Sequence, residues 1–206
     1  MPDPHAFRHL WLPPEDTGDT LLLLHGTGGD ERDLVPLGRS LRPGAGILSI
    51  RGNVLENGMP RFFRRLSEGV FDEADLRVRA EALARFIPAA AVEYGFDAAS
   101  LVAVGFSNGA NMAGALLLLH PGLLRRAVLY RAMVPLRSAS GPDLSGTRVL
   151  LSEGAQDPIV PRAEADELAG LLRKAGADVQ LEWQAAGHGL VEQDLASARA
   201  WLGAAE

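Results

Sequence analysis

The feature that most constrains the fold is a series of short runs in which every residue is apolar. Leu21-Leu22-Leu23-Leu24 and Leu101-Val102-Ala103-Val104 are two such runs. A strand with apolar side chains on both faces is typical of the centre of a parallel sheet that helices cover on both sides. We therefore expect an α/β fold with these two runs as central strands.

Other short apolar runs predict further strands, and segments with helical periodicity separate them. The predicted strands are Phe7–Leu12, Thr20–His25, Gly46–Arg51, Ser100–Gly105, Ala127–Tyr130, Arg148–Ser152 and Val179–Gln184. The predicted helices are Glu31–Leu41, Glu73–Tyr94, Asn108–His120, Arg162–Ala175 and Val191–Leu202. This alternation predicts a mainly parallel sheet, flanked by helices on both faces and connected by right-handed crossovers.

Composition narrows the class of protein. The chain has 206 residues, a length that fits one domain, and it contains no internal repeat or low-complexity linker, so we expect residues 1–206 to form a single domain. The net charge of −6 argues against a nucleic-acid surface, which needs a clustered basic face. Because the chain has no cysteine, disulfides, thiolate metal sites and a cysteine nucleophile are excluded. We expect no metal site.

No segment has the pattern of a membrane span or of a leader. Ala110–Leu119 is strongly apolar but too short to cross a bilayer. Met1–Pro13 lacks the continuous apolar core of a signal peptide. We expect a soluble, cytoplasmic protein without membrane insertion.

The pentapeptide Gly105-Phe106-Ser107-Asn108-Gly109 stands between a predicted buried strand and a predicted helix. This is the G-x-S-x-G pattern of a nucleophile elbow, a strained turn that holds a serine hydroxyl clear of the strand end. Side chains at the two glycine positions would collide with the neighbouring backbone. An ordinary serine in a glycine-rich turn is the alternative, but the strand before and the helix after favour the elbow. Ser107 is the predicted nucleophile.

A glycine-rich segment, His25-Gly26-Thr27-Gly28-Gly29-Asp30, follows the first all-apolar strand. An elbow enzyme needs a loop at this point of the chain to help stabilise the oxyanion of the reaction intermediate. We expect the backbone amides of Thr27 and Asn108 to form the oxyanion hole. A phosphate-binding loop is the rival interpretation, but the segment lacks both the G-K-[ST] ending and the G-x-G-x-x-G spacing. His25 is expected to hydrogen-bond locally and hold the loop.

The base and the acid follow from the chain order serine, acid, histidine. After Ser107, His120 ends a helix, whereas His188 lies in a glycine-flanked loop between the last strand and the last helix. His188 is therefore the predicted general base. Asp157 lies just past the strand Arg148–Ser152 and is the predicted acid that orients it. Glu153 is the nearest competitor, but it is still attached to that strand.

With these motifs in order, the chain resembles the phospholipase/carboxylesterase family of α/β-hydrolases, which includes acyl-protein thioesterases. The resemblance runs from about Leu21 to Leu202 and rests on the glycine loop, the elbow, the acid loop Gly154-Ala155-Gln156-Asp157-Pro158 and Gly187-His188. It implies a serine carboxylesterase that hydrolyses small or medium acyl esters through an acyl-enzyme, without a cofactor. The absence of cysteine separates the chain from dienelactone hydrolases proper.

Two alternatives stay open. An acyl-thioesterase or a lysophospholipase would use the same three residues, and a non-catalytic ligand receptor could be built on the same fold, although receptors of this kind commonly lose a member of the triad. The expected partner is a small-molecule ester, and a homodimer is compatible with the sequence.

We expect two segments at the same edge of the sheet to form the substrate pocket: Gly52 to Phe71, and Tyr130 to Pro135. Gly52 to Phe71 has no clean period, and a loop of this length is usually functional. Within and beside these segments, the candidate substrate-binding residues are Arg51, Met59, Phe62, Phe63, Met133 and Val134. Arg61, Arg64 and Arg65 could also face an anionic substrate, or be solvated. Between Tyr130 and Arg148 there is no room for a cap domain, which predicts an open pocket.

Overall fold

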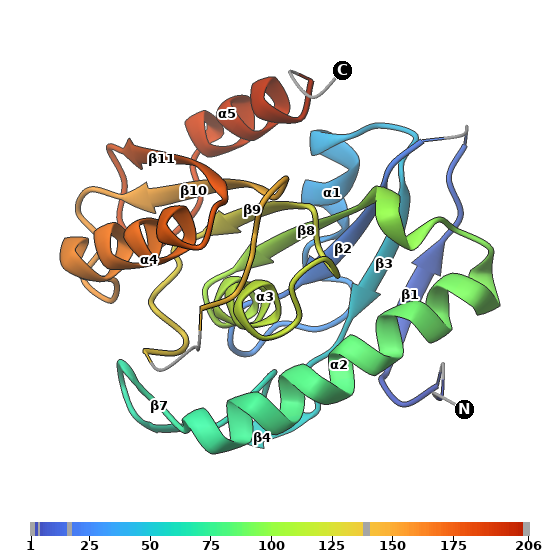
Figure 1. The fold of residues 1–206 in the computed structure, drawn as a ribbon, viewed down its shortest axis with the longest axis horizontal. Coiled ribbons are helices and arrows are strands. Elements are labelled where there is room, and N and C mark those ends of the chain that lie inside the picture. The colour runs from blue at the N-terminus through green and yellow to red at the C-terminus, as the bar shows by residue number, and fades with distance from the viewer. Residues whose placement is uncertain (1–2, 4, 16–17, 138–140, 204–206) are drawn as a thin grey trace.

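A seven-stranded sheet runs through the computed structural model, which describes residues 3, 5–15, 18–137 and 141–203 (Figure 1). The strands lie in the order β1 (His9–Leu12), β3 (Gly46–Ile50), β2 (Thr20–Leu24), β8 (Leu101–Phe106), β9 (Arg126–Tyr130), β10 (Arg148–Gly154) and β11 (Asp178–Gln184). β1 pairs antiparallel with β3, and the other neighbours in this sheet are parallel. The prediction of a mainly parallel sheet is confirmed.

Helices cover both faces of the sheet (Figure 1). One face packs against α2 (Glu73–Tyr94), α3 (Asn108–Leu119) and α4 (Arg162–Lys174), and the other against α1 (Val35–Leu41) and α5 (Glu192–Gly203). A short 3-10 helix, Ala98–Ser100, precedes β8. In β2, Leu22 and Leu24 contribute to the first core and Leu21 and Leu23 to the second. The all-apolar run is explained by this double burial, because successive side chains of a strand point to opposite faces.

The parallel pairing places the carboxyl ends of β2, β8, β9, β10 and β11 at one edge of the sheet. Ligands of open α/β sheets bind at this edge, because the loops that leave it converge. The predicted nucleophile, acid and base each lie in a loop that follows one of these strands. Tertiary structure thus brings together residues that are far apart in the chain.

The segment between β3 and α2 departs from the irregular loop that the sequence predicts. It contains two hairpins, β4 (Val54–Glu56) with β5 (Met59–Arg61), and β6 (Arg65–Ser67) with β7 (Val70–Phe71). Asn57 and Gly58 form the first turn, with φ of 52° and 80°. Asn-Gly is a strong signal for a two-residue hairpin turn, so this turn was readable in the sequence.

The first helix is shorter than predicted, since it begins at Val35 rather than Glu31. Residues 31–34 form turns instead. Pro36 lies in the first turn of the helix, where its missing amide is harmless. Glu31 is buried and its carboxylate pairs with the guanidinium groups of Arg8 and Arg51, a role that its place before the helix allows.

Gly109 offers a test of how tightly α3 packs on the sheet. A Cβ at this position would lie 2.0 Å from the Leu24 carbonyl oxygen, and backbone atoms cannot yield as a side chain can. We predict that Gly109→Ala lowers the free energy of unfolding by about 3 kcal/mol, as measured by urea denaturation.

The matched control is Gly170→Ala, in the exposed part of α4, where an added Cβ meets nothing within 4 Å. This variant is expected to be more stable by about 0.5–1 kcal/mol, because alanine is the better helix former. Equal effects of the two substitutions would contradict the packing described here.

Candidate active site

Ser107 occupies the sharp turn between β8 and α3. Its backbone has φ of 52° and ψ of −113°, a conformation that residues with a side chain rarely adopt. The Ser107 amide donates to the Tyr130 carbonyl oxygen at 2.8 Å, which ties the turn to the end of β9. At Gly105, an added Cβ would lie 2.6 Å from Ala110 Cα. The collision expected at both glycines of the pentapeptide is therefore present in the structure.

Ser107, His188 and Asp157 form a hydrogen-bonded chain. The Ser107 hydroxyl lies 3.0 Å from His188 Nε2, and His188 Nδ1 lies 2.8 Å from Asp157 Oδ2. An ionised carboxylate can only accept, so Nδ1 carries the proton and Nε2 is free to accept from the hydroxyl. The Phe106 ring packs against the imidazole with a centroid separation of 5.4 Å. This arrangement can pass a proton from the hydroxyl to the imidazole.

The loop after β10 holds Asp157 rigidly. Its side chain is fully buried, and Oδ1 accepts from the amides of Ile159 and Val160 at 2.7 and 3.1 Å. A Cβ at Gly154 would lie 2.2 Å from the Gly187 carbonyl oxygen, so the acid and histidine loops meet backbone to backbone.

Glu153, the competing acid, is placed differently. It is completely buried, and its Oε1 accepts from the Ala132 amide at 2.9 Å. Its Oε2 has no hydrogen-bond partner among the described residues. Burial raises the pKa of Glu153 to about 8, although the Ala132 amide and Arg131 oppose the shift. Glu153 is therefore mostly protonated at neutral pH, and within the described residues its carboxyl makes no hydrogen bond to His188.

Thr27 and Asn108, the two predicted oxyanion donors, line the same cleft as Ser107. Within the described residues, neither backbone amide donates a hydrogen bond. The next two amides of the glycine loop are occupied, since Gly28 donates to the Pro60 carbonyl and Gly29 to that of Gly26. The structure thus leaves the two expected amides available for a ligand.

Three successive residues at the end of the first hairpin and just after it, Pro60, Arg61 and Phe62, hydrogen-bond to the glycine loop and to Asn108. Pro60 accepts from the Gly28 amide at 2.9 Å, and Arg61 Nη1 donates to Thr27 Oγ1 at 2.6 Å. The Phe62 amide donates to Asn108 Oδ1 at 2.8 Å. The segment Pro60 to Phe62, which we call the strut, therefore connects the glycine loop to the elbow.

His25 supports the same loop. Its buried ring donates from Nδ1 to the Gly26 carbonyl at 2.6 Å and accepts at Nε2 from the Gly52 amide at 3.0 Å. Burial lowers the pKa of His25, so it stays neutral and can make both bonds. The expected local role of His25 is confirmed.

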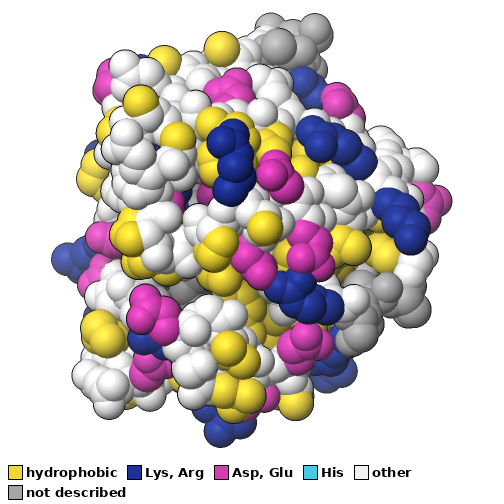
Figure 2. All heavy atoms as spheres, turned by 90° about the vertical axis from the view of Figure 1, so that its left-hand side faces the viewer, with side chains coloured by type: hydrophobic (Ala, Val, Ile, Leu, Met, Phe, Trp, Pro, Cys, Tyr) yellow, Lys and Arg dark blue, Asp and Glu magenta, His cyan; other side chains and the backbone are white. Residues whose placement is uncertain are grey.

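The cleft beside Ser107 has a volume of about 270 Å³. Of the predicted substrate-binding residues, Met133 lines it; Arg61 and Arg65, named as residues that could face an anionic substrate, line it as well. The other lining residues are Thr27, Glu68, Gly69, Phe71, Phe106, Ser107, Asn108, Asn111, Ile159 and His188. The cleft is therefore small and mixed in polarity, and the face of the molecule drawn in Figure 2 likewise shows hydrophobic, basic and acidic side chains interspersed.

The other candidate substrate-binding residues lie outside the lining of this cleft. Phe62 and Phe63 are 2% and 0% exposed and belong to the hydrophobic core. Arg51 is held by the carboxylates of Asp30 and Glu31. Met59 lies on the exposed hairpin beside Gly28, outside the lining of the cleft.

Val134 and Arg64 also lie away from the cleft. Val134 is buried and lines a neighbouring hollow. Its amide donates to a Glu164 carboxylate oxygen at 3.3 Å. Arg64 pairs with the carboxylates of Asp72 and Asp75.

Outside the predicted segment Gly52 to Phe71, three lining residues were not anticipated. Phe106 is the second residue of the pentapeptide, and Asn111 lies one helical turn after Ser107, on the same side of α3. Ile159 follows Asp157 in the acid loop. Their spacing from the catalytic candidates was the available signal for all three.

Among the residues that the structure describes, no helix has both the length and the apolar composition needed to cross a membrane. No cluster of three or more His, Cys, Asp or Glu side chains in the described part of the chain is arranged to hold a metal ion.

Comparison with known proteins gives a consistent result. Residues 53–205 match the phospholipase/carboxylesterase family. A Bacillus subtilis protein named as a hydrolase, MhqD, is 49% identical over 183 residues, covering 89% of this chain and 92% of that protein. The crystal structure of a Bacillus cereus carboxylesterase superposes with a TM-score of 0.95 at 46% identity, covering 98% and 95% of the two chains. A Mesorhizobium loti carboxylesterase superposes with a TM-score of 0.88 at 35% identity, covering 92% and 90%.

The sheet, its flanking helices and these matches define an α/β-hydrolase. The chain belongs to the phospholipase/carboxylesterase family, and it is a hydrolytic enzyme.

The protonation of Glu153 should make the free energy of unfolding depend on pH. A carboxyl whose pKa is raised on folding stabilises the protein below its unfolded pKa, and that contribution is lost as the pH rises toward its folded pKa of about 8. We predict that Glu153→Gln, which cannot ionise, gains stability relative to wild type by up to about 1.4 kcal/mol per pH unit between pH 5 and 8. Urea denaturation at several pH values measures the difference, and parallel curves would contradict the assignment.

Proposed function

We propose that this enzyme is a serine carboxylesterase that hydrolyses small to medium acyl esters through a Ser107–His188–Asp157 triad. The observation that carries the proposal is the unbroken hydrogen-bonded chain from the Ser107 hydroxyl through His188 to Asp157. Two further features support it: the strained backbone of Ser107, and the amides of Thr27 and Asn108, which donate no hydrogen bond within the described part of the chain.

In the acylation step, His188 Nε2 removes the hydroxyl proton as Ser107 Oγ attacks the ester carbonyl carbon. The developing oxyanion is bound by the Thr27 and Asn108 amides, and the loss of such a donor typically costs about 3–4 kcal/mol of transition-state stabilisation. The imidazolium then protonates the departing alcohol. Asp157 holds the Nδ1–H tautomer and stabilises the imidazolium charge.

In the deacylation step, a water molecule takes the place of the alcohol. His188 removes its proton as it attacks the acyl carbonyl, the oxyanion is bound as before, and the proton is returned to Ser107 Oγ. The acid is released and the enzyme is regenerated. The strut from Pro60 to Phe62 keeps both amide donors in place during the two steps.

The role of Ser107 can be tested with a fluorophosphonate probe, which labels activated serines. We predict stoichiometric labelling of wild type and of Ser67→Ala, a control at an exposed serine on β6. Ser107→Ala should not be labelled, and its kcat for a p-nitrophenyl ester should fall by about 10⁴-fold or more. An unlabelled wild-type protein would contradict the proposal and favour a non-catalytic ligand receptor.

The size of the cleft sets an expectation for the acyl chain. A buried CH₂ contributes about 0.8 kcal/mol, so kcat/KM should rise by up to about fourfold for each added carbon and then level off once the cleft is full. Kinetics with p-nitrophenyl esters from acetate upward measure the profile, and acyl-thioesters of equal length measure the preference between ester and thioester. Met133→Ala enlarges the cleft and should move the plateau to longer chains.

The matched control for the chain-length profile is Leu66→Ala. Leu66 is an exposed apolar residue of the second hairpin that does not line the cleft, so its loss should leave the profile unchanged. A rate that still climbs for long-chain esters in wild type would contradict a short acyl site.

A further inference from the structure

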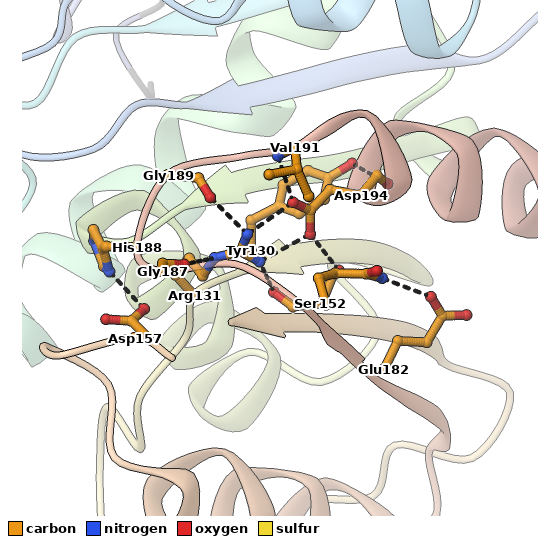
Figure 3. Close-up of polar contacts among 11 residues, drawn as sticks. Tyr130, Arg131, Ser152, Asp157, Glu182, Gly187, His188, Gly189, Val191 and Asp194 are labelled. Carbon is orange, nitrogen blue, oxygen red and sulfur yellow. Dashed lines mark hydrogen bonds and ion pairs between the residues drawn. The ribbon is translucent and has the colours of Figure 1, made fainter. Parts of the chain in front are cut away.

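Arg131 is a fully buried arginine directly behind the histidine loop (Figure 3). It is the first residue after β9, and its backbone has φ of 56°, in the left-handed region that disfavours residues with a side chain. Its amide donates to the Ser152 carbonyl oxygen at 3.0 Å. Burying a guanidinium and holding its backbone in this conformation both cost free energy, which suggests a role other than stability.

The guanidinium donates hydrogen bonds to the residues directly before and after His188 in the histidine loop. Arg131 Nε donates to the Gly187 carbonyl at 3.1 Å, and Nη2 donates to the Gly189 carbonyl at 2.8 Å. Figure 3 shows the side chain reaching between these two carbonyls. The residues before and after His188 are therefore fixed by one rigid, planar group.

Asp194, in the first turn of α5, fixes the guanidinium in turn. Its carboxylate is fully buried and accepts from Arg131 Nη1 and Nη2 at 2.8 and 2.7 Å, a two-pronged pair. It also accepts from Ser152 Oγ at 2.6 Å and from the Val191 amide at 2.8 Å. Arg131 Nη1 donates further to the Ser152 carbonyl. The cluster thus connects β9, β10, the histidine loop and α5.

We propose that Arg131, held by Asp194, is a positioning residue that keeps His188 aligned between Ser107 and Asp157 through the catalytic cycle. This inference rests on the proposed function, since it assigns a role toward the base of that reaction. His188 has to meet the hydroxyl, the leaving group and the attacking water from one position. Because a misplacement of about 1 Å can cost about 10²-fold in rate, a loop whose flanking carbonyls are both clamped serves this chemistry.

The rival explanation is that the pair only stabilises the fold. A buried ion pair is weak evidence for stability, because desolvation can exceed the attraction. Breaking the pair would then reduce the amount of folded protein without changing the activity of each folded molecule. A measurement per active site separates the two explanations.

Arg131→Lys is the decisive variant, since lysine keeps the charge opposite Asp194 but cannot bridge the two loop carbonyls. We expect kcat per fluorophosphonate-titrated site to fall by about 10- to 100-fold, with KM within about threefold of wild type. The low-field proton NMR signal of the His188 Nδ1 proton should weaken or shift. Arg199→Lys, at an ion pair on the surface of α5, is the control and should change none of these quantities.

If Arg131→Lys does not fold, Arg131→Met/Asp194→Leu replaces the test, because it leaves neither charge buried alone. The proposal is overturned if the double variant folds and keeps the wild-type kcat per titrated site. It is equally overturned if Arg131→Lys keeps the wild-type kcat. Failure of the proposed function has a different signature: wild type itself would neither be labelled at Ser107 nor hydrolyse any ester. Low kcat per site in a variant that melts near the wild-type temperature supports the positioning role.

Discussion

The parallel pairing of β2, β8, β9, β10 and β11 is the constraint on which the site depends. Parallel strands end at the same edge, so the loops that follow them converge there, although Thr27 and His188 are 161 positions apart in the sequence. The glycine loop follows β2, the elbow follows β8, the acid loop follows β10 and the histidine loop follows β11. Arg131 follows β9, the strand between the elbow and the acid loop, and so lies at the centre of this edge.

Close backbone contact makes this convergence rigid. Gly109 meets the Leu24 carbonyl, and Gly154 meets the Gly187 carbonyl, at distances that leave no room for a Cβ. Glycine at these points lets whole loops touch, which a side chain would prevent. Ser107 and Arg131 pay the opposite cost, since each holds a left-handed backbone despite its side chain. Among the described non-glycine residues with positive φ, Asn57 forms a hairpin turn, and the other two are the proposed nucleophile and the residue that holds the loop of the proposed base.

Three buried carboxyl groups near this edge differ in their surroundings. Asp157 accepts from two amides and from His188, and Asp194 faces a guanidinium, a hydroxyl and an amide. Glu153 has one amide donor, its other oxygen has no hydrogen-bond partner among the residues that the structure describes, and burial raises its pKa. These different hydrogen-bond partners separate Asp157 from Glu153 on physical grounds, where the sequence could argue only from position along the strand.

The sequence alone determined the fold class, all seven strands of the sheet and the residues of the hydrogen-bonded chain, because period, glycine placement and chain order are local signals. The lining of the cleft was decided only by tertiary structure. The sequence suggested that Phe62 and Phe63 form a wall of the substrate pocket, yet both side chains lie in the core. Arg51 forms ion pairs with Asp30 and Glu31. The clamp of Arg131 on the histidine loop was equally invisible, because its partners lie more than 20 residues away and a lone arginine after a strand carries no pattern. Which side chain fills a given space depends on long-range packing, and no local signal encodes it.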